Sequence, residues 1–264
     1  MRRSRKLRKI VKVTVPREVS KNIKSNITRS NSNQSEISKV TVPLKVNGEK
    51  RKFNNTPPPN VKYSNVPKIW ANETVYIIGG GPSLKGFNWN LLKGKKTIAI
   101  NKAIQFYPNA DVVYWTDGRF HDWFKDEISK FKGLKYTITP RENFIEGVSL
   151  LKRGIKFGLE TATNALAHGN NSGYAAINLA IHLGAKKIIL LGYDMSNSGK
   201  ESHFHDGYKV NATSEKIYTT HFLPGFSVLK ESIKGMNIKI LNASSESKLK
   251  TFPIITIDEA LSLR

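Results

Sequence analysis

The chain has 264 residues, with 43 Lys and Arg against 20 Asp and Glu and no Cys. The lack of cysteine excludes a disulfide framework, a Cys-ligated zinc site, an iron–sulfur cluster and a thiol nucleophile. No apolar run approaches the about 20 residues that span a bilayer. The basic start MRRSRKLRKI also lacks the apolar stretch of a secretory signal, so we expect no membrane span and a cytoplasmic protein.

The positive charge is concentrated near the amino terminus. Residues 1–70 contain 18 Lys and Arg and 3 Glu, a net of +15, whereas residues 71–264 have a net of +8. Residues 1–60 are rich in polar side chains and end in the stiff spacer Pro57–Pro59. We expect residues 1–60 to form a basic, largely extended or disordered arm that attracts nucleic acid or an acidic protein. A tail that only aids solubility is the other interpretation.

The rest of the chain, residues 61–264, alternates apolar strands with helices. Predicted strands cover residues 74–78, 96–100, 111–115, 136–138, 187–191 and 238–241, and predicted helices cover 173–183 and 224–234. This alternation predicts an α/β domain with a mostly parallel sheet and helices on both faces. Ligands of such sheets bind beyond the carboxyl ends of the strands, which is where the polar clusters of this sequence fall.

The first polar cluster follows the first predicted strand and consists of Gly79, Gly80, Gly81, Pro82 and Ser83. Glycines at this place let backbone N–H groups approach a phosphate closely. The cluster is neither a P-loop nor the dinucleotide fingerprint G-x-G-x-x-G. The sequence therefore favours an anion site here, with a tight turn as the alternative.

Further candidates follow the second and third strands and precede the apolar helix. Asn101 and Asp117 can contact a ribose, a base or a metal-bound phosphate, although both residue types also cap helices and form turns. Asn171, Ser172 and Gly173 open the helix, where a cap leaves N–H groups that favour an anion. A plain helix cap is the alternative for these three residues.

Asp194 follows the strand 187–191, and the loop behind it carries His203, His205 and Tyr208. The two histidines are two residues apart, so in a strand they would share a face and could bind a metal with Asp194. In a loop they could act as acids, bases or phosphate donors. We expect this loop to be functional.

His221 precedes the predicted helix 224–234. Because a helix amino terminus disfavours a charged imidazolium, we expect a neutral side chain there that can act as a base. His121, His168 and His182 lie apart from the polar clusters and are expected to be structural.

Together, the motifs Gly79–Leu84, Asn101, Asn171–Gly173 and Gly192–Asp194 resemble the bacterial family-42 sialyltransferases. That family carries G-N-G-P-S-L after its first strand, an Asn after its second, S-G at a helix start and then G-x-D. The same superfamily includes archaeal 6-hydroxymethylpterin pyrophosphokinase-like proteins. A group of tailed-phage proteins is similar over about residues 70–260, which implies the host cytoplasm or association with a virion.

The resemblance implies a modified Rossmann-like fold and a glycosyltransferase-like enzyme. Its donor would be a nucleotide-sugar such as a CMP-sugar, no metal or other cofactor would be obligatory, and His221 would act as the base. The phosphate-binding tyrosines of the family are missing, so His203 and His205 would take their place. Asp194 belongs to the same predicted catalytic set.

Two alternatives stay open. Asp117 stands where the family has Asn, and an Asp suits a metal–triphosphate, as in an ATP- and Mg²⁺-dependent pyrophosphokinase-like enzyme. A metal would then lie near Asp117, Asp194, His203 and His205. The other alternative is a non-catalytic phage structural or nucleic-acid-associated protein that uses the fold as a binding module and its basic arm as a docking segment.

Overall fold

The computed structural model describes residues 44–46, 49–51, 61–141, 145–196 and 214–263. Its contacts divide the chain into two units, residues 1–54 and 55–264. In the first unit, β1 (Leu44–Val46) pairs with β2 (Glu49–Arg51) in an antiparallel ladder. The second unit contains the other elements and all the strand ends that the sequence marks as functional.

Seven strands in the described part of the second unit form one sheet, and every neighbouring pair is parallel. They are β3 (Thr74–Ile78), β4 (Lys96–Ile100), β5 (Val112–Trp115), β6 (Leu134–Thr137), β7 (Val148–Leu150), β10 (Lys187–Leu191) and β11 (Lys239–Asn242). Their order across the sheet is β11-β10-β3-β4-β5-β6-β7. The chain therefore reverses its direction of strand addition between β3 and β10, the place where open parallel sheets bind ligands.

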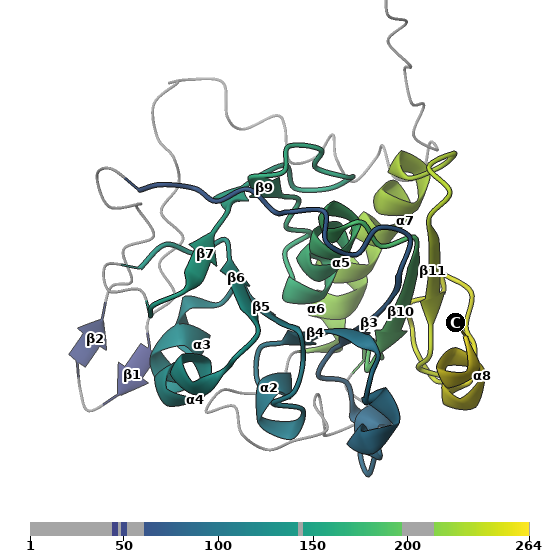
Figure 1. Ribbon diagram of the computed structural model, residues 1–264, viewed down its shortest axis with the longest axis horizontal. Coiled ribbons are helices and arrows are strands. Elements are labelled where there is room, and N and C mark those ends of the chain that lie inside the picture. Colours follow the sequence, from purple (N-terminus) through teal and green to yellow (C-terminus); the bar gives the residue numbers. More distant parts are fainter. Residues whose placement is uncertain (1–43, 47–48, 52–60, 142–144, 197–213, 264) are drawn as a thin grey trace, which may run out of the picture. The chain divides into compact units, whose positions relative to one another are not determined.

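Helical segments cover both faces of this sheet, which confirms the predicted α/β class (Figure 1). One face is covered by α5 (Ser172–Leu183) and α7 (Leu223–Ser232). The other carries η1 (Pro82–Leu84), η2 (Trp89–Leu92), α2 (Ala103–Phe106), α3 (Gly118–Trp123), α4 (Lys125–Lys130) and α8 (Ile257–Ser262). The short α6 (Glu215–Ile217) and the π-helical turn η3 (Tyr218–Phe222) precede α7. The two-residue strands β8 (Lys152–Arg153) and β9 (Ala165–Leu166) pair with each other beside α5.

Burial on both faces explains the unbroken apolar runs of the strands. In β3, Val75 and Ile77 pack toward α5, whereas Tyr76 and Ile78 pack toward the opposite helices. Successive side chains of a strand point to opposite faces, so a strand covered on both sides needs apolar residues at every position. The predicted strands 74–78, 96–100 and 187–191 coincide with β3, β4 and β10 for this reason.

The helix α5 places its amino terminus at the carboxyl edge of the sheet. The Asn171 side chain caps it by accepting from the Tyr174 N–H at 2.7 Å, and Gly184 ends it with a left-handed φ of 107° that glycine tolerates. Between these ends, the side chains from Tyr174 to Ala180 are buried. The apolar core thus fixes α5 rigidly beside the strand ends.

Two open grooves lie at the other, amino-terminal edge. One of about 690 Å³ lies between the end of α7 and the start of β11, and one of about 530 Å³ lies between the end of α4 and the start of β6. No described helix is long and apolar enough to pass through a bilayer.

Candidate functional site

The ends of β3, β4, β5 and β10 meet the start of α5 at the carboxyl edge. A hydrogen bond joins the hydroxyls of Thr116, which follows β5, and Ser172. The Tyr193 hydroxyl, which follows β10, donates to the Gly173 carbonyl at 3.0 Å. These two bonds attach the start of α5 to both sides of the switch point. Thr116 and Tyr193 were not among the predicted site residues, although Thr116 directly follows one predicted strand and Tyr193 lies two residues after another.

The glycine turn after β3 packs tightly against the turn after β10. The Gly79 N–H donates to the Leu191 carbonyl at 2.8 Å, and the Gly81 N–H donates to the Gly192 carbonyl at 2.9 Å. A Cβ atom on Gly79 would lie 2.7 Å from the Gly192 oxygen, and one on Gly81 would lie 1.9 Å from Asp194 Oδ2. Close packing against the Gly192 backbone, and at Gly81 also against the Asp194 side chain, therefore explains the glycine at both positions.

Asp194 fixes this turn through Ser83. Its Oδ1 accepts from the Ser83 N–H at 3.0 Å, and its Oδ2 accepts from Ser83 Oγ at 2.8 Å. Burial raises the pKa of Asp194 above its usual value, and the two Ser83 bonds oppose that shift. Asp194 is 5% exposed, and both of its carboxylate oxygens bond to Ser83, so it holds this turn in place; its catalytic part stays a prediction.

The turn leaves few donors for a ligand. The N–H groups of Gly79, Gly81 and Ser83 all donate within the protein, and Pro82 has none. Among the described residues, nothing accepts from the Gly80 N–H, and Gly80 is partly exposed. We call Gly79, Gly81, Ser83, Gly192 and Asp194 the β3–β10 frame.

Asn101, at the end of β4, has a different environment. Its backbone is left-handed, with φ of 50°, and its N–H donates to the Tyr114 carbonyl at 3.0 Å. Its Oδ1 atom is buried and has no hydrogen-bond partner in the described part of the chain. Buried polar atoms nearly always have a partner in folded proteins, so this amide oxygen is a candidate acceptor for a ligand donor.

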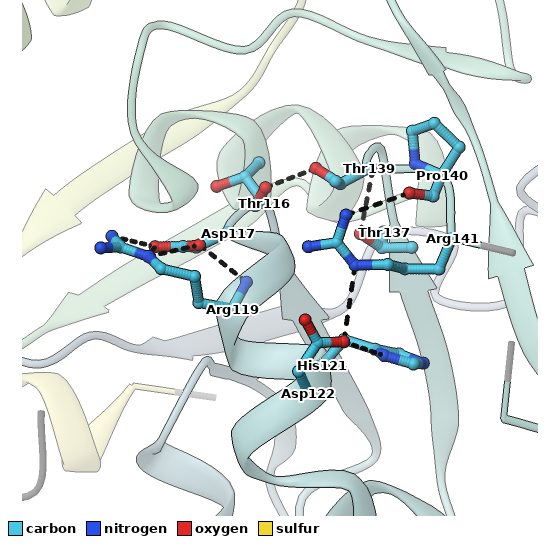
Figure 2. A network of polar contacts seen from close by, with 9 residues as sticks. All are labelled: Thr116, Asp117, Arg119, His121, Asp122, Thr137, Thr139, Pro140 and Arg141. Carbon is cyan, nitrogen blue, oxygen red and sulfur yellow. Dashed lines mark hydrogen bonds and ion pairs between the residues drawn. The ribbon is translucent and has the colours of Figure 1, made fainter. Parts of the chain in front are cut away.

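Figure 2 shows that Asp117 has a local structural task. Its side chain caps α3 by accepting from the Arg119 N–H at 2.9 Å, and its carboxylate forms an ion pair with the Arg119 guanidinium. In the same network, Thr139 Oγ1 donates to the Thr116 carbonyl, and this bond connects the ends of β5 and β6. The structure therefore matches the helix-capping interpretation of Asp117.

Arg141 follows β6 and was not predicted from the sequence. Its side chain is 13% exposed, its Nε lies 3.6 Å from Asp122 Oδ1, and Asp122 also contacts His121 Nδ1 at 3.2 Å (Figure 2). The guanidinium lies against Gly118, where a Cβ atom would be 1.5 Å from Nη2. Nothing in the local sequence signals this contact, because it joins two loops that follow different strands.

The three residues predicted at the start of α5 divide into a cap and two N–H donors. Asn171 accepts from Tyr174, and its own Nδ2 donates to the Gly169 carbonyl at 3.1 Å. The N–H groups of Ser172 and Gly173 have no acceptor among the described residues. These two donors, the Gly80 N–H and Asn101 Oδ1 form what we call the open set.

His221 does not lie at a helix start, which corrects the sequence-based expectation. The segments α6, η3 and α7 follow one another without a break, so the helical run already begins at Glu215. The Thr220 hydroxyl donates its only hydrogen to the Lys216 carbonyl at 2.6 Å. It must therefore accept from His221 Nδ1, so Nδ1 carries a hydrogen and, in the neutral ring, Nε2 of this exposed side chain carries the lone pair.

The predicted residues His203, His205 and Tyr208 lie outside the described residues. In the part of the chain that the structure describes, no group of three His, Asp or Glu is placed to hold a metal ion. Asp117 and Asp194, the other two residues of the predicted metal set, bond to Arg119 and Ser83 respectively.

No protein-family model matches this sequence, and no curated protein matches it either. The fold is similar to that of the MAf glycosyltransferase from Magnetospirillum magneticum AMB-1, with a TM-score of 0.54 and 16% identity over 76% of this chain. The match covers 36% of that protein, so this chain corresponds to about a third of it. The sialyltransferase CstII from Campylobacter jejuni, solved with the substrate analogue cytidine-5'-monophosphate, matches 70% of this chain and 86% of its own at a TM-score of 0.45 and 18% identity. At 16% identity, the likeness to the MAf protein establishes the fold alone.

Proposed function

We propose that the carboxyl edge of the sheet binds a nucleotide-sugar and that the protein transfers the sugar to an acceptor hydroxyl. The observation that carries this proposal is the buried Asn101 Oδ1 atom, which has no partner among the described residues and lies beside the switch point of the sheet. An amide oxygen accepts from a base amino group or a ribose hydroxyl. The N–H groups of the open set suit phosphate oxygens, so the set as a whole matches a nucleoside phosphate.

The class of reaction draws on two further observations. The MAf protein, whose fold this chain shares in part, is a glycosyltransferase, and the motifs of the sequence resemble the family-42 sialyltransferases. Fold alone does not define function, so both observations support the proposal without replacing a test. A CMP-sugar is the first donor to examine.

His221 supplies the base in this proposal. The β10–α7–β11 connection places the start of the α7 helical run at the carboxyl edge, and His221 Nε2 carries the lone pair. It takes the proton of the acceptor hydroxyl while that oxygen forms a bond to the anomeric carbon. The bond between this carbon and the phosphate oxygen breaks, and the nucleotide leaves with the bonding electrons.

Calorimetric titration of the full chain with CMP, CDP, UDP, GDP and ATP tests nucleotide binding. We expect one nucleotide to bind, and Asn101→Gly to weaken it about tenfold, since about 1.4 kcal/mol is lost with one hydrogen bond. Glycine keeps the left-handed backbone of residue 101.

The matched control is Asn72→Gly. Asn72 is an exposed asparagine with φ of 67° that precedes β3 at the opposite edge, so its substitution should leave affinity unchanged. Absence of binding by every nucleotide, or equal losses in the two variants, would overturn the proposal.

A further inference from the structure

Three basic side chains gather beside the start of α5. Arg153 lies on β8, Lys156 follows it in the next loop, and His168 lies shortly before Ser172. Arg153 and Lys156 are exposed, and neither takes part in an ion pair within the described part of the chain. The nearby Glu160 carboxylate accepts from the N–H groups of its own loop instead.

The hydrogen bonds of His168 fix its tautomer. Its Nδ1 accepts from Arg153 Nη2 and from the Asn170 N–H, both at 3.2 Å. A guanidinium and a backbone N–H group can only donate, so Nδ1 carries no proton and Nε2–H is a donor. Burial, with the charges of Arg153 and Lys156, lowers the pKa of His168 to about 4, which keeps the ring neutral near pH 7. His168 thus carries its hydrogen on Nε2, whereas His221 carries one on Nδ1.

The core holds this cluster beside the proposed reaction centre. The Asn178 side chain, buried in α5, accepts from the N–H groups of Glu160 and Ala167 at 3.0 Å each. The loop that follows β8 also packs on α5 and α7. Gly158 bonds to the Tyr174 hydroxyl of α5, and the Phe157 ring lies against Gly225 of α7.

His221 lies about one helical turn before Gly225. The loop that follows Lys156 therefore contacts both Tyr174, near the start of α5, and the helical run that carries His221.

We propose that Arg153, Lys156 and His168 bind an anionic group, a phosphate or a carboxylate, of the acceptor. The cluster offers a guanidinium, an ammonium and a neutral N–H donor, and none of these can accept a hydrogen bond. A planar guanidinium with a second cation is a strong receptor for such oxyanions. The proposal rests on the proposed function and names the acceptor as an anionic molecule. The same groups would also suit a phosphate of the donor, so the test separates these sources.

The test compares the double variant Arg153→Gln/Lys156→Gln with the control Lys152→Gln. Lys152 is the neighbouring exposed lysine on β8, its ammonium lies 5.6 Å from the Tyr63 ring centre, and it points to the other side of the strand. The probes are glucose 6-phosphate, N-acetylneuraminate and the nucleotide that binds the wild type. Binding is followed by calorimetry and by the His168 Nε2–H signal in NMR.

We expect at least one anionic sugar to shift the His168 signal and to bind about tenfold more weakly to the double variant, with the control unchanged. Nucleotide affinity should be the same in all three proteins. An equal loss of nucleotide affinity in the double variant would assign the cluster to the donor phosphates and overturn the acceptor assignment. No shift of His168 with either sugar would overturn it as well. Nucleotide binding by the wild type reports separately on the proposed function.

Discussion

The polar groups of the carboxyl edge behave differently on the two sides of β3. In the β3–β10 frame, the N–H groups of Gly79, Gly81 and Ser83 and the carboxylate of Asp194 bond to protein atoms. Toward β4 and α5, the open set has donors and an acceptor with no described partner. A buried group that bonds internally stabilises the fold, whereas one that lacks a partner costs stability unless a ligand completes it.

This difference changes the meaning of the glycine motif. From the sequence, the glycines predict a phosphate cradle, but two of the three serve to bring β3 and β10 close together. In the proposed site, Gly80 is the glycine of this motif that offers its N–H to the ligand, and Asn101 and the start of α5 would supply the other contacts. Substitutions in the frame should therefore affect stability first, and substitutions in the open set or at His221 should affect binding or turnover first.

The largest expected effect concerns His221, whose Nε2 has no described partner. His221→Gln should lower turnover about a hundredfold or more, the usual contribution of a general base, while nucleotide affinity and stability stay near wild type. Steady-state release of the nucleotide from its sugar donor measures this. Lys216→Gln, an exposed change in the same helical run, serves as the control, and equal activity of the two variants would remove His221 from the mechanism.

Gly81→Ala should be the most damaging change within the frame. The new methyl group would overlap Asp194 Oδ2 at 1.9 Å and the Gly192 oxygen at 2.6 Å, and the expected loss is about 3 kcal/mol of unfolding free energy. Urea denaturation measures it. At Gly86 nothing lies within 4 Å and φ is 75°, so Gly86→Ala should cost only about 1 kcal/mol of backbone strain. Similar losses at both sites would contradict the tight packing described for the frame.

Because Ser83 and Asp194 bond to each other, we expect that the losses of unfolding free energy caused by their substitutions do not add. Asp194→Ala removes the acceptor of two hydrogen bonds and should cost about 2 kcal/mol, whereas Ser83→Ala removes only the hydroxyl bond. A double-mutant cycle on unfolding free energies should give a coupling of at least about 0.5 kcal/mol. Strictly additive losses would show that Asp194 stabilises the turn through some other contact.

The smallest expected effect is a change in the pH dependence of stability. The pKa of folded His168, about 4, lies below its ordinary value of 6.5, so the unfolded chain binds the proton more readily. His168 therefore lowers stability as pH falls from about 6.5 toward 4. Burial lowers the pKa of His182 too, which adds a slope of the same sign. Urea denaturation at pH 7 and pH 5 should show a shallower loss for His168→Gln than for wild type, and identical losses would contradict the bonding assigned to Nδ1.

The sequence predicted the fold well where burial alone decides the pattern. The strands β3, β4 and β10 are apolar throughout because both faces are covered. In contrast, β7 has only three residues with one fully buried position, too few for a periodic signal. The helix α8 was missed although its capping box, Thr256 with Glu259, is legible in the sequence.

The site was predicted only as far as strand ends can be recognised. Asn101, Ser172 and Gly173 were found because each directly follows a strand or opens a helix. The Ser83–Asp194 bond joins residues 111 positions apart. The Arg153–His168 bond joins β8 to the segment after β9, and local sequence does not reveal these two short strands. Such contacts depend on how the chain crosses the sheet, which no local pattern encodes.

The central claim is that a nucleotide binds to the open set at the carboxyl edge. Amide NMR spectra of the ¹⁵N-labelled full chain, recorded during titration with CMP or the tightest-binding nucleotide of the panel, test it most directly. If the nucleotide binds there, the signals of Gly80, Asn101, Ser172 and Gly173 shift together. Shifts confined to the groove between α7 and β11, at Gly235 and Lys239, with an unchanged carboxyl edge would contradict it.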